Sequence, residues 1–363
     1  MGRIILAKLA ELIIGTNKRI TRFLISVAIL VFVAALWRKN KEFVVIFLFA
    51  LFIYWLFAKC IFRKPEDKLE DIKHLLQLEK FEKALEKIEE VMTKDLSKVK
   101  KDKINSIYYT CIYYKATCLW HKAFTTGNTE YLRESAKLYE ELLDFYFKEN
   151  KNTDYIMSSI GFIYYNLGFL EDDQEVIKDA IKVLDISLDN ERNTKETNIS
   201  SIYLGLANCY QVLAKHSNSE EYLKKSLEEL KNAYIQITRG KHPYEEAVLN
   251  IIRTSVLRKL NEINHNEEYK MQAINYLNDA MKYLNTMYNI YYKKYFPNRY
   301  ITMRVYMSKV YFEMYKINGS KEELSRFNEA VHEIQECMLK ENNAYSRKQI
   351  DEMLDELKLE VKK

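Results

Sequence analysis

Glycine and proline are scarce in this sequence, with 8 Gly and 3 Pro among 363 residues. Turn-rich β architectures and long flexible linkers both need more of these residues. Lys, Glu, Leu and Asn are abundant instead, in runs with helical spacing. The sequence therefore predicts an all-α chain that is long enough for two or more structural units.

Motifs of common catalytic and nucleotide-binding sites are missing as well. The sequence has no Gly-x-Gly-x-x-Gly, no Gly-Lys-Ser/Thr phosphate loop and no Gly-x-Ser-x-Gly turn. The run HEIQE at 332–336 has Glu336 where a zinc protease requires its second histidine, so we interpret it as a polar helix face. We expect a protein that is not an enzyme and that uses no cofactor.

Five cysteines, at 60, 111, 118, 209 and 337, lie in apolar helical runs without paired spacing. This distribution indicates small buried side chains in a reducing compartment rather than a disulfide framework. Cys111, Cys118 and His121 lie near one face of one predicted helix and could hold zinc with a fourth ligand. Their spacing matches no zinc finger, so we favour core cysteines beside a half-exposed histidine and expect no metal.

The net charge of +5 is unevenly distributed. Residues 1–64 contain 11 Lys/Arg and 2 Asp/Glu, which leaves 45 Lys/Arg and 49 Asp/Glu for residues 65–363. A body that binds nucleic acid would carry the positive excess itself. We therefore expect no nucleic-acid partner.

Two uncharged apolar runs, 23–37 and 43–58, flank a short charged stretch at 38–42. With their neighbours they extend over 20–37 and 43–62, because Arg22 and Lys59 can reach toward the lipid head groups. That length approaches the roughly 20 residues that cross a bilayer core. We predict a transmembrane hairpin of two spans; the alternative is a buried hairpin of a soluble protein, covered on all sides.

Positive charges predict the orientation of this hairpin. The turn at 38–42 carries three Lys/Arg, whereas the opposite flanks carry nine. The positive-inside rule then places both termini in the cytoplasm and the turn outside the cell membrane. Residues 4–14 suit a helix in the membrane interface, although they could equally pack against the body. The expected domains are an anchor, 1–64, and a cytoplasmic domain, 65–363.

The body of the chain repeats one layout. Five segments join an aromatic-rich helix to a second helix through polar loops that read TTGNTE, LEDDQE, KHSNSEE, NEINHNEE and KINGSKEE. Each loop supplies an Asn, Asp or Ser that can cap the second helix, followed by acids that favour the positive end of its dipole. Aligned on the loops, the first helices share a column of small residues: Ala116, Gly161, Gly205, Thr254 and Ser308.

The second helices carry two further columns. One is small except at its last member: Ser135, Ala180, Ser226, Ala273 and Phe327. Four residues on, the side chains are large and apolar: Tyr139, Leu184, Leu230, Leu277 and Val331. Small residues let two helices cross closely, and large ones fill the core between them.

This layout resembles the tetratricopeptide repeat (TPR), as does the earlier run with Phe81, Ala84 and Ile88 at helical spacing. The repeats are 45 to 54 residues long, against 34 in a standard TPR. The resemblance implies a TPR-like α-solenoid of about six helix pairs over 66–342, closed by a capping helix at 344–361 with a charged outer face. Pro243 and Pro297 are expected in the first turns of two first helices.

TPR-type arrays generally bind a protein or peptide partner on their concave face, which the first helices line. The resemblance implies the same for this chain. Candidate binding residues follow the small column by one, four and five positions: Trp120, His121, Phe162, Tyr165, Asn166, Tyr210, Arg258, Lys259, Phe312 and Glu313. The basic pair could meet a carboxylate while the aromatic residues grip side chains. The 28 tyrosines could form the core or line this groove, and the sequence leaves both open.

We therefore expect a membrane-anchored scaffold or adaptor that recruits or assembles partner proteins on the cytoplasmic face of the membrane. One alternative is a sensor whose solenoid encloses a peptide or small ligand. Another is a purely structural subunit of a larger membrane assembly.

Overall fold

The computed structural model describes residues 65–98, 101–194, 199–217, 219–237, 243–288, 297–338 and 344–361. Contacts divide the chain into two compact units, 1–64 and 65–363, and the described residues belong to the second. The predicted anchor segments 4–14, 20–37 and 43–62 lie outside them. None of the helices described has both the length and the hydropathy of a membrane span.

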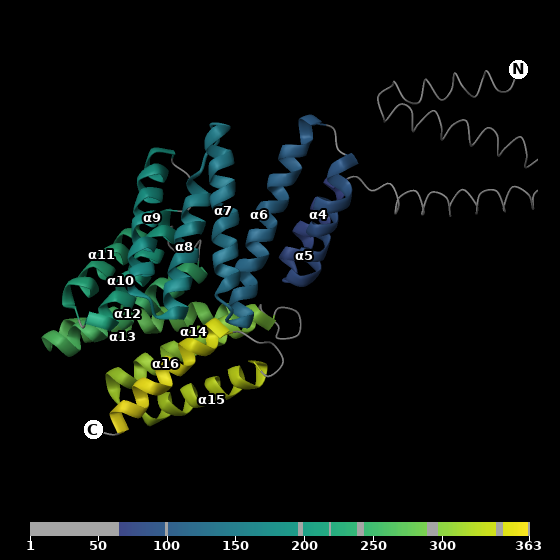
Figure 1. Ribbon diagram of the computed structural model, residues 1–363. Helices are drawn as coiled ribbons and strands as arrows, with labels where there is room; N and C mark the ends of the chain where they lie inside the picture. The colour runs from purple at the N-terminus through teal and green to yellow at the C-terminus, as the bar shows by residue number, and fades with distance from the viewer. Residues whose placement is uncertain are drawn as a thin grey trace, which may run out of the picture. The chain divides into compact units, whose positions relative to one another are not determined.

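The described part of the chain is all-α and holds no strand, as the sequence predicts. Its helices follow one another in pairs, and a last helix closes the order (Figure 1). A π-helical turn, Val91–Asp95, and a 3-10 turn, Leu96–Lys98, follow the first pair. The first three pairs are α4 (Pro65–Gln77) with α5 (Phe81–Glu90), α6 (Lys101–Thr126) with α7 (Glu130–Lys148), and α8 (Asp154–Glu171) with α9 (Gln174–Thr194). The next three are α10 (Ile199–Ser217) with α11 (Glu220–Gln236), α12 (Pro243–Asn264) with α13 (Glu267–Tyr288), and α14 (Pro297–Asn318) with α15 (Lys321–Met338). The last helix is α16 (Ala344–Val361).

The pairs stack into a solenoid. Each second helix contacts the first helix of its own pair and that of the next pair. First helices also contact one another, as α4 does with α6, and α8, α10, α12 and α14 do in turn. Neighbours approach most closely on the inner side of a curved array, so the first helices form the inner layer. The predicted helical-repeat architecture is confirmed.

The polar loops end and restart helices by one recurrent device. A residue with positive φ follows the first helix at Gly127 (71°), Asp172 (61°), His265 (51°) and Gly319 (70°). The residue that follows each of these positions caps the second helix. Asp173 Oδ1, for example, accepts a hydrogen bond from Glu175 N at 2.9 Å. Asn128, Ser219, Asn266 and Ser320 also accept backbone N–H groups of second helices. Pro243 and Pro297 begin α12 and α14 as predicted.

The small columns mark the points where paired helices cross. Ser135 Oγ donates to the Ala116 carbonyl at 2.8 Å, and Thr254 Oγ1 to the Ala273 carbonyl at 3.3 Å. A Cβ added to Gly161 would lie 2.7 Å from Leu184 Cδ2, which is closer than Cβ atoms normally come. All members of the large apolar column are buried. These contacts agree with the predicted roles of the columns: small residues allow close crossing, and large apolar residues fill the core.

The third repeat departs from the predicted alignment by two residues. Ser226 Oγ donates to the carbonyl of Ala207 at 2.9 Å, so Ala207 and not Gly205 crosses the second helix there. A Cβ on Gly205 would instead meet Phe162 Cε1 at 2.7 Å, a residue of the preceding repeat. The crossing residues are therefore 19 positions apart in this repeat too. Gly205 must be small because Phe162 packs against it. Its small size is why the alignment placed it at the helix crossing.

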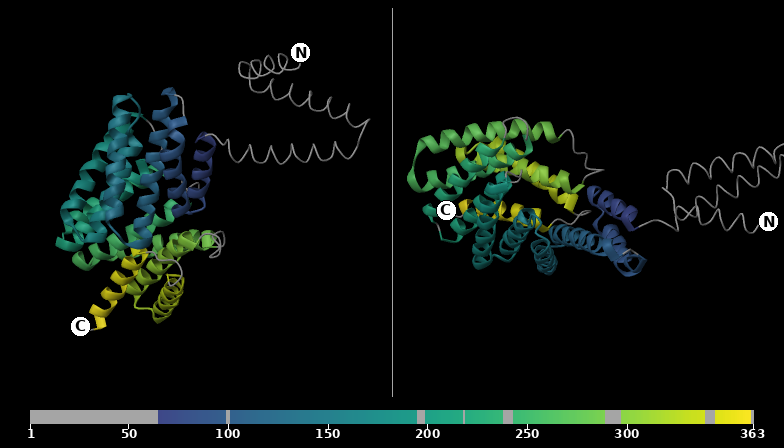
Figure 2. Two further views of the ribbon diagram at one scale, coloured as in Figure 1. Left: turned by 45° about the vertical axis from the view of Figure 1, so that its right-hand side comes forward. Right: turned by 90° about the horizontal axis from the view of Figure 1, so that it is seen from above.

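Helix α16 takes a position that an end cap would not reach. Its buried Ile350 and Met353 join the apolar cluster of α14 and α15, as a cap would. It also contacts α6, near the start of the solenoid, and follows the inner side of the curve (yellow, view from above in Figure 2). The helix predicted at 344–361 thus exists, but it lies against the first helices rather than only across the end of the array.

Candidate functional site

A cavity of about 810 Å³, partly open to solvent, lies on the inner side of the solenoid. Residues of α8, α10, α12 and α14 line it, and α16 lines it from the facing side. Tyr165 and Phe169 of α8, with ring centroids 6.2 Å apart, lie at one part of its wall. Ile251, Ile252 and Met353 contribute further apolar surface. This volume is within the range of small-molecule sites.

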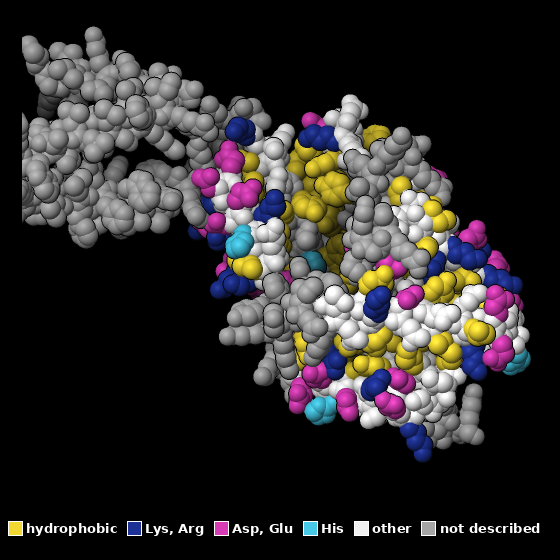
Figure 3. All heavy atoms as spheres, turned by 180° about the vertical axis from the view of Figure 1, so that it is seen from behind, with side chains coloured by type: hydrophobic (Ala, Val, Ile, Leu, Met, Phe, Trp, Pro, Cys, Tyr) yellow, Lys and Arg dark blue, Asp and Glu magenta, His cyan; other side chains and the backbone are white. Residues whose placement is uncertain are grey.

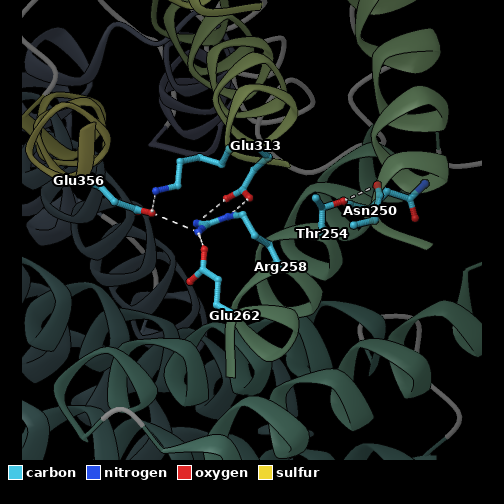
Figure 4. A network of polar contacts seen from close by, with 8 residues as sticks. Asn250, Thr254, Arg258, Glu262, Glu313 and Glu356 are labelled. Carbon is cyan, nitrogen blue, oxygen red and sulfur yellow. Dashed lines mark hydrogen bonds and ion pairs between the residues drawn. The ribbon is translucent and has the colours of Figure 1, made fainter. Parts of the chain in front are cut away.

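Arg258 is the centre of a charged network at this cavity (Figure 4). Its Nε donates to Glu313 Oε2 at 2.5 Å, and its NH1 nitrogen lies 2.6 Å from Glu262 Oε1 and 3.1 Å from Glu356 Oε1. Lys316 Nζ lies 3.1 Å from the same Glu356 oxygen. Burial alone would lower the pKa of Arg258, but the surrounding carboxylates outweigh it and raise the pKa. Arg258 therefore stays charged and joins α12, α14 and α16.

Two further polar contacts attach α16 to the inner layer. Glu352 lies 3.0 Å from Lys215 Nζ of α10. Lys348 Nζ donates to the backbone carbonyls of Phe169 and Leu170, at the end of α8. These carbonyls carry the partial negative charge of a helix C-terminus, which favours a nearby cation. Helix α16 is thus bound to the inner face by charged groups as well as by apolar packing.

Lys259 and Lys309 also line the cavity, and burial lowers the pKa of both. The positive charge of Arg258 adds to the effect on Lys259, while Glu313 and other carboxylates oppose it. For Lys309 the lowered pKa is about 8, although Glu352 and Glu313 act in the opposite direction. Both ammonium groups are therefore poorly stabilised in this structure.

The structure brings five of the ten predicted groove residues to the cavity: Tyr165, Arg258, Lys259, Phe312 and Glu313. The other five lie elsewhere. His121 stacks on Phe81 with ring centroids 4.6 Å apart, and Trp120 lies beside it. Asn166 is buried, Phe162 packs against the core of the next repeat, and Tyr210 stacks on Tyr222 at 6.2 Å.

Sequence reasoning missed several cavity residues, and the misplaced crossing of the third repeat explains three of them. With Ala207 as the third crossing residue, the positions one, four and five later are Asn208, Gln211 and Val212, and all three line the cavity. Lys309 follows Ser308 by one position, so the same rule identifies it. The contribution of α16, including Glu352 and Glu356, had no signal in the repeat pattern.

The remaining candidates are core residues. Cys111 and Cys118 are buried in the cluster around α4 and α5, and burial raises the pKa of each thiol to about 12. Within the described residues, no group of His, Cys, Asp and Glu is arranged to hold a metal ion. Tyr139 is buried, with its hydroxyl 3.1 Å from Thr117 Oγ1. Some tyrosines are thus core residues, while Tyr165 faces the cavity.

The chain matches no protein-family model and no curated protein. One solved structure similar to it is described as "DHF58 filament", with 12% identity and a TM-score of 0.20 over 69% of this chain and 99% of that chain. Another is the de novo designed helical repeat protein DHR64, with 14% identity and a TM-score of 0.16 over 80% and 100%. Such low scores add nothing to what the helices show directly. The residues that the structure describes form an all-α helical-repeat solenoid.

Proposed function

We propose that this protein is a membrane-anchored, TPR-like scaffold or adaptor. Residues 1–64 would hold it to the cell membrane through two spans, with both termini in the cytoplasm. The inner face of the solenoid would recruit or assemble partner proteins there. The observation that carries the proposal is the position of α16, because a helix of the chain itself already binds along this inner face.

The chemistry of that contact indicates what kind of partner segment would fit. Acidic residues of α16, Glu352 and Glu356, meet Lys215, Arg258 and Lys316 of the first helices. A helix with acidic residues four positions apart places both on one face. Seen from the side opposite Figure 1, hydrophobic side chains also gather in a hollow of the surface (Figure 3). An amphipathic acidic helix is the partner segment that we expect.

Crosslinking in cells followed by purification in detergent tests this proposal. The full chain is compared with a Lys215→Glu variant on the inner layer and a matched Lys231→Glu variant on exposed α11. We expect Lys215→Glu to lose specific partners that wild type and Lys231→Glu retain. Identical partners for all three chains would refute recruitment through the inner face.

A second candidate is a sensor in which a peptide or small ligand changes the position of α16. The cavity favours it, since α16 forms one wall and a bound molecule would contact that helix directly. Amide hydrogen exchange of α16 measures this coupling. A ligand that leaves exchange in α16 unchanged would exclude the sensor role.

A further inference from the structure

Helix α16 is held on the inner face by few buried side chains. Among its described residues, the buried apolar ones are Ile350 and Met353, whereas Leu354 and Leu357 are only partly buried. The ion pair that joins Glu352 to Lys215 lies between side chains that are 33% and 52% exposed. Ion pairs of such exposed groups stabilise a contact only weakly and are screened by salt.

Part of α16 faces the cavity rather than packed side chains. The residues that it contributes to the lining are Gln349, Glu352, Met353, Asp355 and Glu356. First helices α8, α10, α12 and α14 form the opposite wall. Unfilled volume forfeits the dispersion contacts that a close-packed interface would make. The contact between α16 and the inner layer is therefore incompletely packed, which lowers the free energy needed to release this helix.

Release of α16 would not leave the buried Arg258 without a partner. Its NH1 nitrogen lies 3.1 Å from Glu356 of α16 (Figure 4). The same guanidinium also contacts Glu313 of α14 and Glu262 of its own helix. Because a buried charge is costly only when it has no compensating group, two remaining carboxylates keep Arg258 stable. The inner face can thus exchange Glu356 for a carboxylate of another helix.

We propose that α16 is an autoinhibitory segment, which occupies the inner face in place of a partner's acidic amphipathic helix. Glu352 and Glu356 take the positions at Lys215 and Arg258 that two carboxylates of the partner would take. A partner must displace α16 to bind there. Since α16 belongs to the same chain, its local concentration is high, and a partner of equal intrinsic affinity is excluded. The inference rests on the proposed recruitment through the inner face and adds its regulation.

Binding of an α16 peptide to the full chain in detergent tests this inference. The probe is a fluorescent peptide with the wild-type sequence of residues 344–361, and its anisotropy measures the affinity. In the chain, Glu352→Lys/Glu356→Lys places positive charges against Lys215, Arg258 and Lys316, which should displace α16. We expect this variant to bind the peptide at least about tenfold more tightly than wild type does.

A matched control reverses two carboxylates outside the inner face. Glu228→Lys/Asp279→Lys makes the same change in net charge at exposed positions of α11 and α13. It should bind the peptide as weakly as wild type. Adding Lys215→Glu to Glu352→Lys/Glu356→Lys should weaken peptide binding several-fold, because the probe loses a cation on the inner layer. Peptide binding that ignores Lys215→Glu would place the probe elsewhere and overturn the inference.

Amide hydrogen exchange of residues 344–361 shows whether α16 has left the inner face. Exchange should be faster in Glu352→Lys/Glu356→Lys than in wild type, while the helices of the solenoid keep their protection and the circular dichroism stays helical. Wild type alone gives a second measurement: 1 M sodium chloride should accelerate exchange in α16 more than in α10 or α11. Unchanged exchange of α16 in both experiments would show that charged contacts do not hold it and would overturn the inference.

The outcomes separate autoinhibition from recruitment. If wild type and Glu352→Lys/Glu356→Lys bound the peptide equally, and Lys215→Glu weakened both, the inner face would be a binding site that α16 does not close. Autoinhibition would then be refuted and recruitment supported. If neither chain bound the peptide, autoinhibition would be refuted as well, whereas the crosslinking of partners to Lys215→Glu would still decide recruitment.

Discussion

Gly161 of α8 lies directly against Leu184 of α9: a Cβ at residue 161 would be 2.7 Å from both Cγ and Cδ2 of that leucine. Leu184 is fully buried and belongs to the large core of the middle repeats. The absence of a side chain at one residue thus allows the other to fill the space between two helices. Small residues also allow the close crossing of α6 and α7, where Ser135 donates a hydrogen bond to the carbonyl of Ala116.

Gly161→Ala should destabilise the protein by about 1 to 3 kcal/mol, because overpacking displaces Leu184 and the backbone of α9. Leu184→Ala alone should cost about 2 to 5 kcal/mol through the cavity that it leaves. Since the two side chains would compete for one space, the double variant should lose less than the sum of both. Urea unfolding followed by circular dichroism measures all three, and strict additivity would contradict the contact.

His265→Gly should stabilise the protein by about 0.5 to 1 kcal/mol, because φ at this exposed residue is 51° and glycine adopts that conformation without steric cost. Gly319→Ala is the converse test at a φ of 70°, where no atom lies within 4 Å of an added Cβ. Its expected cost of about 1 kcal/mol is therefore conformational rather than steric. Melting temperatures that shift in the same direction for both variants would contradict this explanation.

Arg258→Met should destabilise the protein by about 3 to 5 kcal/mol, because Glu313 would remain buried without its partner. Glu313→Gln combined with Arg258→Met removes both buried charges and should recover a large part of that loss. Denaturant unfolding compares wild type, the single and the double variants. If the double variant were as unstable as the sum of its parts, the ion pair would not be the source of the effect.

The pKa of Lys309 makes stability depend on pH. Its folded value is about 8 against 10.5 for an ordinary lysine, so between these pH values the unfolded chain binds more protons at this residue. The free energy of unfolding should therefore rise with pH across this window, by about 1 to 3 kcal/mol relative to Lys309→Met. Glu352 of α16 and Glu313 of α14 favour the charged form of Lys309 and limit the decrease in its pKa. The other charged groups that line the same cavity are Arg258, Lys259 and Glu262 of α12; Lys215 of α10; Asp172 after α8; and Asp355 and Glu356 of α16.

Unfolding in urea at pH 7.5, 8.5 and 9.5 measures this dependence in the wild type and in Lys309→Met. A difference between wild type and Lys309→Met that does not change with pH would show that solvent reaches the ammonium freely. Lys282→Met serves as the control, since this lysine is exposed on α13.

The anchor prediction concerns residues 1–64 and is tested by fractionation. The full chain should sediment with membranes after lysis without detergent and should resist extraction by alkaline carbonate, because two apolar spans would cross the bilayer. In a Cys60→Ser background, Asn40→Cys should react with an impermeant thiol reagent added outside intact cells. Recovery of the full chain in the supernatant would refute the anchor, and reaction only after lysis would reverse its orientation.

Much of the fold could be predicted because its determinants are local. Polar loops with Asn, Asp or Ser caps, first-turn prolines and small residues at helix crossings act over a few residues or within one hairpin. The two-residue shift in the third repeat arose because Gly205 and Ala207 are both small, and each meets a different neighbour in the packed structure. Equal spacing with the second-helix column, in which Ser226 was placed correctly, would have favoured Ala207.

Half of the predicted groove residues line the cavity because the rule of one, four and five positions follows from helical geometry. His121 does not, because its ring stacks on Phe81 of the preceding pair. The rule carries no information about which neighbour a side chain will meet. That choice depends on how far each pair is rotated against the next.

The sequence by itself determined where helices begin and end, which residues lie at most of their crossings, and that the pairs stack in one direction. Only the tertiary structure decided that α16 lies inside the curve, that Arg258 joins Glu313 and Glu356, and that Lys259 and Lys309 face one cavity. The physical reason is distance along the chain: capping and crossing act within a hairpin, whereas curvature adds small rotations over many repeats. Residues far apart in sequence meet only after those rotations have accumulated.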